Sequence, residues 1–186
     1  MNRAVFLDKD GTLIKNVSYN VDPAFIEFEP YAFEALQILH NHEFIFVIIT
    51  NQPGIAFAFF TEDDLKKAGE YIGEKLRQQG ININGFYYCP HHKSGRLGAY
   101  AIDCNCRKPA PGLLFKAASD MDIDLSRSWM IGDILNDVEA GNKAGCKTIL
   151  INNGNETEWL LNKSRTPDYI VKDLKEAAEI IIKTGN

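Results

Sequence analysis

Short apolar segments and longer amphipathic segments alternate along almost the whole of this chain. Apolar runs of about four to eight residues are typical of buried strands, and apolar residues at helical spacing are typical of helices that cover a sheet. Strands that alternate with helices are joined by crossovers, which favour parallel pairing. The sequence therefore predicts an α/β fold, a parallel sheet covered by helices on both faces. The predicted strands are residues 4–7, 44–50, 85–89, 129–132, 148–151 and 169–171, and the predicted helices are residues 30–41, 61–79, 113–120, 136–144 and 174–183.

The chain has 186 residues, a length at which one domain buries a substantial core without disulfide bonds. We therefore expect a single domain over residues 1–186. The longest apolar run, residues 44–49, is far shorter than the roughly 20 residues that a membrane helix needs, and the N-terminus does not resemble a signal peptide. A formal net charge of -5 gives no general attraction for nucleic acid. These properties predict a cytoplasmic protein, most simply a monomer, that binds neither membrane nor nucleic acid.

The first predicted strand ends at a pair of aspartates, Asp8 and Asp10, which are followed by Gly11. Alternate side chains of an extended segment share a face, so the two carboxylates can point into one small volume while the glycine allows a sharp turn. Two negative charges this close favour a divalent cation bound through oxygen, and Mg²⁺ suits phosphate chemistry. The alternative is a solvated acidic turn that only ends the strand.

Polar side chains also follow the second predicted strand, as Thr50, Asn51 and Gln52. Their hydroxyl and amide groups can form neutral hydrogen bonds with a phosphoryl oxygen. Taken alone, such residues more often end strands and cap turns, so a structural role is the stronger interpretation of this segment by itself.

A basic pair, Arg107 and Lys108, precedes a predicted helix, and Pro109 and Pro111 restrict the backbone that presents it. Beside Asp8, the lysine would screen the carboxylate and bind a phosphoryl oxygen. The arginine would bind a second phosphate or a hydroxyl group. An isolated basic pair would instead be a solvated surface feature.

The strand predicted at residues 129–132 is followed by Asp133 and, one helical turn later, by Asp137. Asp133 is a natural third oxygen ligand for the cation, and Asp137 could orient Lys108 or a metal-bound water. Either acid could instead cap the following helix or interact with its dipole.

Three of the four cysteines and two of the four histidines fall within one short segment. Thiolates together with an imidazole suit tetrahedral Zn²⁺, and we expect Cys89, His91, Cys104 and Cys106 to form a closed structural site. Zinc there would pin a loop, residues 89–108, that is too long and too polar to order itself. The alternatives are a disulfide, which the expected compartment disfavours, and four unrelated side chains.

Together and in this order, these segments resemble the motifs of the haloacid dehalogenase superfamily of phosphotransferases, over nearly the whole chain. The resemblance implies a Rossmann-like, HAD-like fold that lacks a large cap domain. The matching residues are Asp8 and Asp10 for the first motif, Thr50 for the second, Lys108 for the third, and Asp133 with Asp137 for the fourth.

The chemistry of that superfamily is also implied by the resemblance. Asp8 would attack phosphorus to form an aspartyl phosphate, with Lys108 neutralising charge. Asp10 would first protonate the leaving oxygen and then activate the water that hydrolyses the intermediate. Mg²⁺ would be held by Asp8, Asp10 and Asp133, with Asp137 in support. An acid at position 10 indicates a phosphatase.

The zinc loop, combined with the segments around Thr50 and Lys108, is similar to one branch of the superfamily, which contains heptose bisphosphate and histidinol-phosphate phosphatases. The resemblance implies a small phosphorylated metabolite as the substrate, with D-glycero-D-manno-heptose 1,7-bisphosphate as the better match. It also implies a substrate loop at residues 16–21. The substrate-binding residues expected on this basis are Asn16, Tyr19, Asn51, Gln52 and Arg107.

Two departures from the branch affect the expected substrate. Phe57 and Ile134 stand where an arginine and a lysine are usual, so the substrate carries fewer negative charges or other cations compensate. Other hypotheses stay open at this point. They are a phosphatase of histidinol phosphate or another small metabolite, a polynucleotide 3′-phosphatase, and a non-catalytic binding protein stabilised by zinc.

Overall fold

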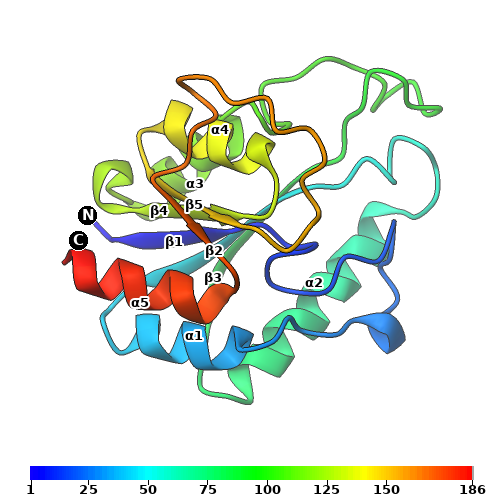
Figure 1. Cartoon of the computed structure of the whole chain (residues 1–186). Helices are drawn as coiled ribbons and strands as arrows, with labels where there is room; N and C mark the ends of the chain where they lie inside the picture. The colour runs from blue at the N-terminus through cyan, green and yellow to red at the C-terminus, as the bar shows by residue number, and fades with distance from the viewer. Residues whose placement is uncertain (186) are drawn as a thin grey trace.

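A computed structural model describes residues 1–185 and contains one six-stranded sheet in which all neighbouring strands are parallel (Figure 1). The strand order is β3-β2-β1-β4-β5-β6. Every strand predicted from the sequence is confirmed to within two residues at each end. The strands are β1 (Ala4–Leu7), β2 (Ile45–Asn51), β3 (Ile83–Cys89), β4 (Trp129–Gly132), β5 (Lys147–Ile151) and β6 (Tyr169–Val171).

Helices cover both faces of the sheet, as the sequence predicts. The helices α1 (Ala32–His40), α2 (Glu62–Arg77) and α5 (Leu174–Thr184) contribute buried residues to one core cluster, together with alternate residues of the strands. The helices α3 (Gly112–Met121) and α4 (Leu135–Ala144) contribute to the cluster on the other face. Short 3₁₀ helices, η1 (Pro23–Phe25) and η2 (Leu125–Arg127), lie in two of the connections.

The strands at the centre of the sheet are buried on both faces. In β1, Val5 and Leu7 belong to one core cluster, whereas Ala4 and Phe6 belong to the other. Successive side chains of a strand point to opposite faces, so a central parallel strand must be apolar throughout. This requirement explains why the apolar runs identified the central strands correctly.

Helix α2 begins with a reciprocal pair of capping hydrogen bonds. The hydroxyl of Thr61 accepts a hydrogen bond from the backbone N–H of Asp64, and the Asp64 carboxylate accepts one from the backbone N–H of Thr61. This reciprocal arrangement is a capping box, which satisfies two backbone donors that a helix start would otherwise leave free.

The carboxyl ends of the parallel strands meet at one edge of the sheet, where an open α/β fold has its ligand crevice. The loops that leave this edge are the segments after Leu7, Asn51, Cys89, Gly132 and Ile151. Within residues 1–185, no helix combines the length and the apolar composition that crossing a membrane requires.

Candidate active site

Three neighbouring strands bring the predicted catalytic residues together. In the sheet, β1 lies between β2 and β4. Asp8 directly follows β1, Thr50 and Asn51 are the last two residues of β2, and Asp133 directly follows β4. All three of Asp8, Thr50 and Asp133 are buried. The sheet topology therefore assembles residues that are more than 100 positions apart in the sequence.

Lys108 comes from the loop before α3 and forms the cationic centre of this site. Its Nζ lies 2.5 Å from Asp8 Oδ1 and 2.6 Å from Asp137 Oδ1, and it donates a hydrogen bond of 2.8 Å to the carbonyl oxygen of Ile49. Burial alone would lower the pKa of Lys108, but the two carboxylates raise it above its usual value. The lysine is therefore a permanently charged group fixed between both acids.

The side chain of Asn51 holds the lysine segment in place. Its Oδ1 accepts a hydrogen bond from the backbone N–H of Lys108, and its Nδ2 donates one to the backbone carbonyl of Lys108, both at 3.0 Å. Both functional ends of the amide are thus engaged by main chain. This geometry makes Asn51 a positioning residue for Lys108, and its predicted contact with substrate stays a prediction.

The carboxylates of Asp8, Asp133 and Asp137 lie close enough for one oxygen of each to be within 4.8 Å of the others. Burial, together with repulsion from the neighbouring acids, raises the pKa of Asp133 to about 8 and that of Asp137 to about 6. One lysine does not neutralise three carboxylates. A buried excess of negative charge with oxygen donors is the environment that a hard divalent cation such as Mg²⁺ stabilises, so the donor set fits this ion.

Asp10 lies beside this cluster, but its carboxylate has other partners. Lys9 Nζ lies 2.6 Å from Asp10 Oδ1, and Gln52 Nε2 donates a hydrogen bond of 3.0 Å to Asp10 Oδ2. Burial raises the pKa of Asp10, and Asp8 adds to the rise, while Lys9 and Gln52 oppose it. A raised pKa suits the predicted role in proton transfer. The further prediction that Asp10 binds the metal has no support from the carboxylate cluster, in which Asp137 takes part instead.

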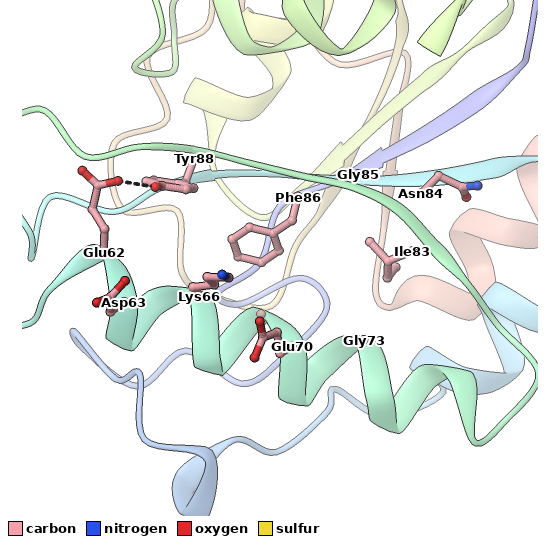
Figure 2. Close-up of a pocket in the computed structure, with 11 residues that line it drawn as sticks. Glu62, Asp63, Lys66, Glu70, Gly73, Ile83, Asn84, Gly85, Phe86 and Tyr88 are labelled. Carbon is pink, nitrogen blue, oxygen red and sulfur yellow. Dashed lines mark hydrogen bonds between the residues drawn. The ribbon is translucent and has the colours of Figure 1, made fainter. Parts of the chain in front are cut away.

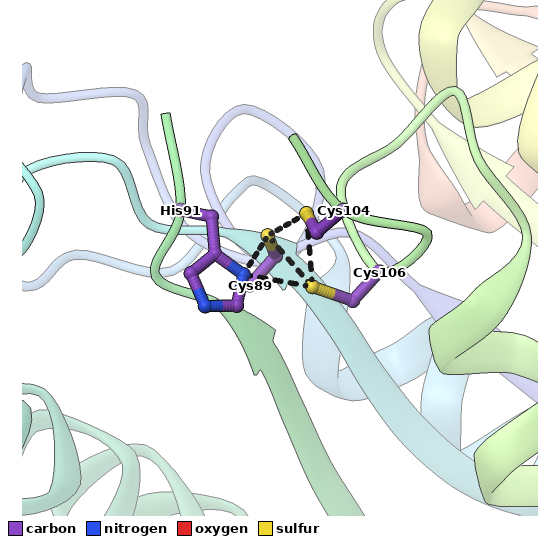
Figure 3. Close-up of side chains that lie close together, drawn as sticks. All are labelled: Cys89, His91, Cys104 and Cys106. Carbon is purple, nitrogen blue, oxygen red and sulfur yellow. Dashed lines mark hydrogen bonds between the residues drawn. The ribbon is translucent and has the colours of Figure 1, made fainter. Parts of the chain in front are cut away.

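The four predicted zinc ligands converge on one point (Figure 3). The sulfur atoms of Cys89, Cys104 and Cys106 are 3.1 to 3.5 Å apart, and Nδ1 of His91 lies 3.2 Å from Cys106 Sγ and 3.7 Å from Cys89 Sγ. A tetrahedral zinc ion with Zn–S bonds of about 2.3 Å requires sulfurs separated by roughly 3.8 Å. All the cysteines are free thiols. The cluster therefore fits zinc after a small expansion and does not form a disulfide.

A second anchor holds the middle of the zinc loop. The carboxylate of Glu62, the first residue of α2, accepts hydrogen bonds from the hydroxyls of Tyr100, at 2.5 Å, and of Tyr88 (Figure 2). Tyr100 lies within the zinc loop and Tyr88 precedes the ligand Cys89 on β3. These hydrogen bonds lower the pKa of Glu62, so the anchor persists in its charged form at neutral pH.

The candidate substrate residues lie on separate segments of the protein. Arg107 and Lys108 line a pocket of about 290 Å³ with residues of the zinc loop. Asn16 and Tyr19 lie on the exposed loop that follows β1, and the Tyr19 ring contacts Phe59. A larger hollow of about 530 Å³ lies between α2 and β3, and none of the catalytic carboxylates lines it (Figure 2).

Cations that could compensate for Phe57 and Ile134 differ in their availability. Lys9 pairs with Asp10, and Lys15 pairs with Glu27. The guanidinium of Arg107 instead donates a hydrogen bond of 3.3 Å to the carbonyl oxygen of His91, and no ion pair involves it within residues 1–185. Arg107 is thus the available cation of the three.

Sequence reasoning did not identify a set of polar residues after β5. Asn155 Nδ2 donates a hydrogen bond of 2.7 Å to Asp133 Oδ2, and Asn153 Nδ2 donates one of 2.7 Å to the carbonyl oxygen of Gly11. Glu156 accepts a hydrogen bond from the backbone N–H of Leu135 at the start of α4. The signal was present, because this polar run follows an apolar strand in the same way as Asp8 does.

Comparison with known proteins gives consistent matches. Residues 105–177 match the HAD-hydrolase-like family model. The D-glycero-beta-D-manno-heptose-1,7-bisphosphate 7-phosphatase of Pasteurella multocida (strain Pm70) is 37% identical over 183 residues, which cover 97% of each chain. The phosphatase of the same name from Escherichia coli (strain K12) is 35% identical over 184 residues, 94% of this chain and 96% of the relative.

Solved structures agree with these relatives. A HAD-like phosphatase from Mesorhizobium loti superposes with a TM-score of 0.85 at 31% identity, covering 100% of this chain and 88% of that one. The D,D-heptose 1,7-bisphosphate phosphatase of B. bronchiseptica, solved with magnesium and phosphate, gives a TM-score of 0.81 at 26% identity, over 98% of this chain and 99% of that one. The motif residues, the fold and these matches agree, and the chain belongs to the HAD-like hydrolase family, among its phosphatases.

Proposed function

We propose that this protein is a Mg²⁺-dependent phosphatase that hydrolyses a phosphomonoester of a small sugar, with D-glycero-β-D-manno-heptose 1,7-bisphosphate as its substrate. The observation that supports this proposal best is the pair formed by Asp8 and Lys108, 2.5 Å apart and next to a protonatable Asp10. The substrate is inferred from the heptose bisphosphate 7-phosphatases that are 33 to 39% identical to this chain over most of their length.

The first chemical step is the attack of an Asp8 oxygen on phosphorus. The P–O bond to the sugar breaks as the aspartyl phosphate forms, and the sugar oxygen takes a proton from Asp10. Lys108 orients the Asp8 carboxylate, because its ammonium group is within hydrogen-bond distance of that carboxylate. Thr50, whose hydroxyl accepts a hydrogen bond from Gln52, is placed to bind a phosphoryl oxygen at the end of β2.

The second step hydrolyses the aspartyl phosphate. Asp10, now deprotonated, takes a proton from water, and the water oxygen displaces Asp8 from phosphorus to release inorganic phosphate. Mg²⁺, held by Asp8 and Asp133, would supply neutralisation of the phosphoryl charge. Gln52 and Lys9 keep the Asp10 carboxylate oriented through both steps.

Zinc would have a structural role, separate from the chemistry. Its four ligands lie at the two ends of the loop and leave no position for substrate, which is the pattern of a closed site. We further propose that the chain works as a single domain and a monomer in the cytoplasm. In this proposal Cys89, Cys104 and Cys106 act as thiolate ligands, and the cytoplasm is a compartment that keeps thiols reduced.

Phosphate release from a panel of esters tests this proposal. The panel contains heptose 1,7-bisphosphate, histidinol phosphate and an oligonucleotide with a 3′-phosphate. We expect the heptose bisphosphate to have the highest kcat/KM, and a higher value for either other substrate would replace the assignment. Asp8→Asn should abolish release from every ester, while Asp63→Asn, at an exposed position of α2, serves as the control. Unchanged activity of Asp8→Asn would refute the assignment of Asp8 as the nucleophile.

A further inference from the structure

Four rings from three different loops contact one another beside the active site, and we call Tyr19, Phe57, Phe59 and His92 the aromatic rim. The ring centroids of Tyr19 and Phe59 are 4.7 Å apart in an edge-to-face arrangement. Phe59 and Phe57 stack at 5.8 Å, and Phe57 lies 4.9 Å from the His92 ring. The rim therefore joins the loop after β1, the loop after β2 and the zinc loop.

All three loops are connected to the catalytic groups. Tyr19 lies in the loop that follows Asp10, and the loop carrying Phe57 and Phe59 begins at Gln52, whose amide binds Asp10. His92 lines the same pocket as Lys108. The aromatic rim thus belongs to three loops that each carry or contact a group of the active site.

Two members of the aromatic rim present a large part of their surface to solvent. Tyr19 is 49% exposed and Phe59 is 52% exposed. Leaving aromatic surface in water is unfavourable, so contiguous exposed rings at the opening of a polar site indicate a binding surface. The catalytic groups below them are polar and charged, which leaves the rim as the apolar part of the site.

The rim is held in place by the main chain of the zinc loop. The backbone N–H groups of Arg96 and Leu97 both donate hydrogen bonds to the carbonyl oxygen of Ala56, at 2.7 and 3.0 Å. The guanidinium of Arg96 lies 5.8 Å from the Phe59 ring centroid. These contacts fix the position of the rings, and a fixed ring loses little freedom when a ligand packs against it.

We propose that Tyr19 and Phe59 determine specificity by packing against the apolar face of a closed sugar ring, so that the enzyme selects cyclic over open-chain sugar phosphates. One face of a pyranose presents several C–H groups, and these match the face of an aromatic ring in size and polarity. The phosphorylated exocyclic carbon then points down to Asp8. An open-chain polyol phosphate has the same reacting group but no rigid apolar face. This inference rests on the proposed phosphatase function.

A pair of probes, one with a closed sugar ring and one with an open chain, tests the proposal. Methyl α-D-mannopyranoside 6-phosphate has a locked ring, and D-mannitol 1-phosphate is its open-chain counterpart. Both carry one phosphate on a primary carbon. We expect the wild-type kcat/KM to be higher for the pyranoside, and Phe59→Ala and Tyr19→Ala each to reduce the ratio of the two values by about fivefold.

Matched variants separate an aromatic effect from a structural one. Phe59→Tyr keeps the ring and should keep the ratio, whereas Phe59→Leu keeps apolar volume but should lose most of the preference. Phe115→Ala removes an exposed ring on α3, outside the rim, and should leave kcat/KM for both probes unchanged. Thermal unfolding of each variant shows whether a loss of activity reflects a loss of fold.

The outcomes distinguish the two proposals. Equal loss of activity toward both probes, or a ratio unchanged in Phe59→Ala and Tyr19→Ala, overturns the specificity inference and leaves the phosphatase intact. The phosphatase function itself is refuted if the wild-type protein releases no phosphate from either probe, none from ethyl phosphate and none from the ester panel.

Discussion

Replacement of Lys108 by methionine should destabilise the fold as well as stop catalysis, because the lysine neutralises buried acids. Lys108 is 3% exposed and Asp137 is fully buried. Within residues 1–185, Asp137 Oδ1 has no polar partner other than the Lys108 ammonium group, at 2.6 Å. Methionine keeps the volume but removes the charge and leaves this oxygen unpaired.

The expected cost follows from the burial of this ion pair. Removal of one partner from a buried pair costs about 3 to 5 kcal/mol of unfolding free energy. The exposed pair formed by Lys116 and Asp120 on α3, 2.9 Å apart, provides the control, since removal of one partner from such a surface pair costs less than about 1 kcal/mol. Urea denaturation of Lys108→Met and Lys116→Met at about neutral pH compares the unfolding free energies of the two variants directly.

A double variant and a change of pH make the explanation specific. Lys108→Met combined with Asp137→Asn no longer leaves the fully buried Asp137 carboxylate without its partner, so the double variant should be more stable than Lys108→Met by at least about 1 kcal/mol. The folded-state pKa of Asp137 is raised, chiefly by burial, to about 6 even with the lysine present. The folded protein then binds a proton that the unfolded chain has released, so stability decreases as pH rises through this range. The deficit of Lys108→Met should accordingly be larger at alkaline than at acidic pH.

Two results would refute this reasoning. One is a Lys108→Met variant that is destabilised no more than Lys116→Met. The other is a double variant whose loss of stability equals the sum of the two single losses, since additivity would show that the buried charges do not interact.

Three further predictions concern proton transfer, zinc and the loop anchor. Asp10→Asn should lower kcat/KM for sugar phosphates by about 10² to 10⁴ and should remove the decline in activity that deprotonation of Asp10, whose pKa is raised by burial, causes as pH rises. The activity toward p-nitrophenyl phosphate, whose leaving group needs no proton, should decrease less. Cys106→Ser should abolish stoichiometric zinc binding in the purified protein. Zinc retention by the wild type should decrease at low pH, because burial raises the pKa of the Cys89 thiol and zinc must displace its proton. Glu62→Gln should raise KM more than it lowers kcat, with zinc content unchanged, because it weakens the acceptor for Tyr100 while the metal cluster stays intact.

Each of these predictions has an outcome that contradicts it. An unchanged pH profile in Asp10→Asn would show that another group donates the proton to the leaving oxygen. Full zinc content in Cys106→Ser would exclude that sulfur as a ligand. A loss of zinc in Glu62→Gln would show that the anchor and the metal cluster form one unit.

The sequence by itself determined the elements of the fold and the catalytic candidates. Central strands buried on both faces have to be apolar throughout, so runs such as residues 129–132 located these strands of the sheet. The polar residues that follow these runs lie at the functional edge of a parallel sheet, and this regularity identified Asp8, Thr50 and Asp133 without any contact information. The clustering of Cys89, His91 and two further cysteines predicted the zinc site for a similarly local reason.

Contacts that depend on strand order and loop course were decided only by the tertiary structure. The pairing of β4 with β5 brings Asn155 to Asp133, and no local pattern contains that adjacency. Lys108 was assigned to the site from the sequence, with Asp137 as a candidate partner, but the role of Asn51 in holding the Lys108 backbone appears only when two distant chain segments meet. The distribution of charge in a buried site depends on distances of a few ångströms between distant segments, and spacing along a chain does not encode them.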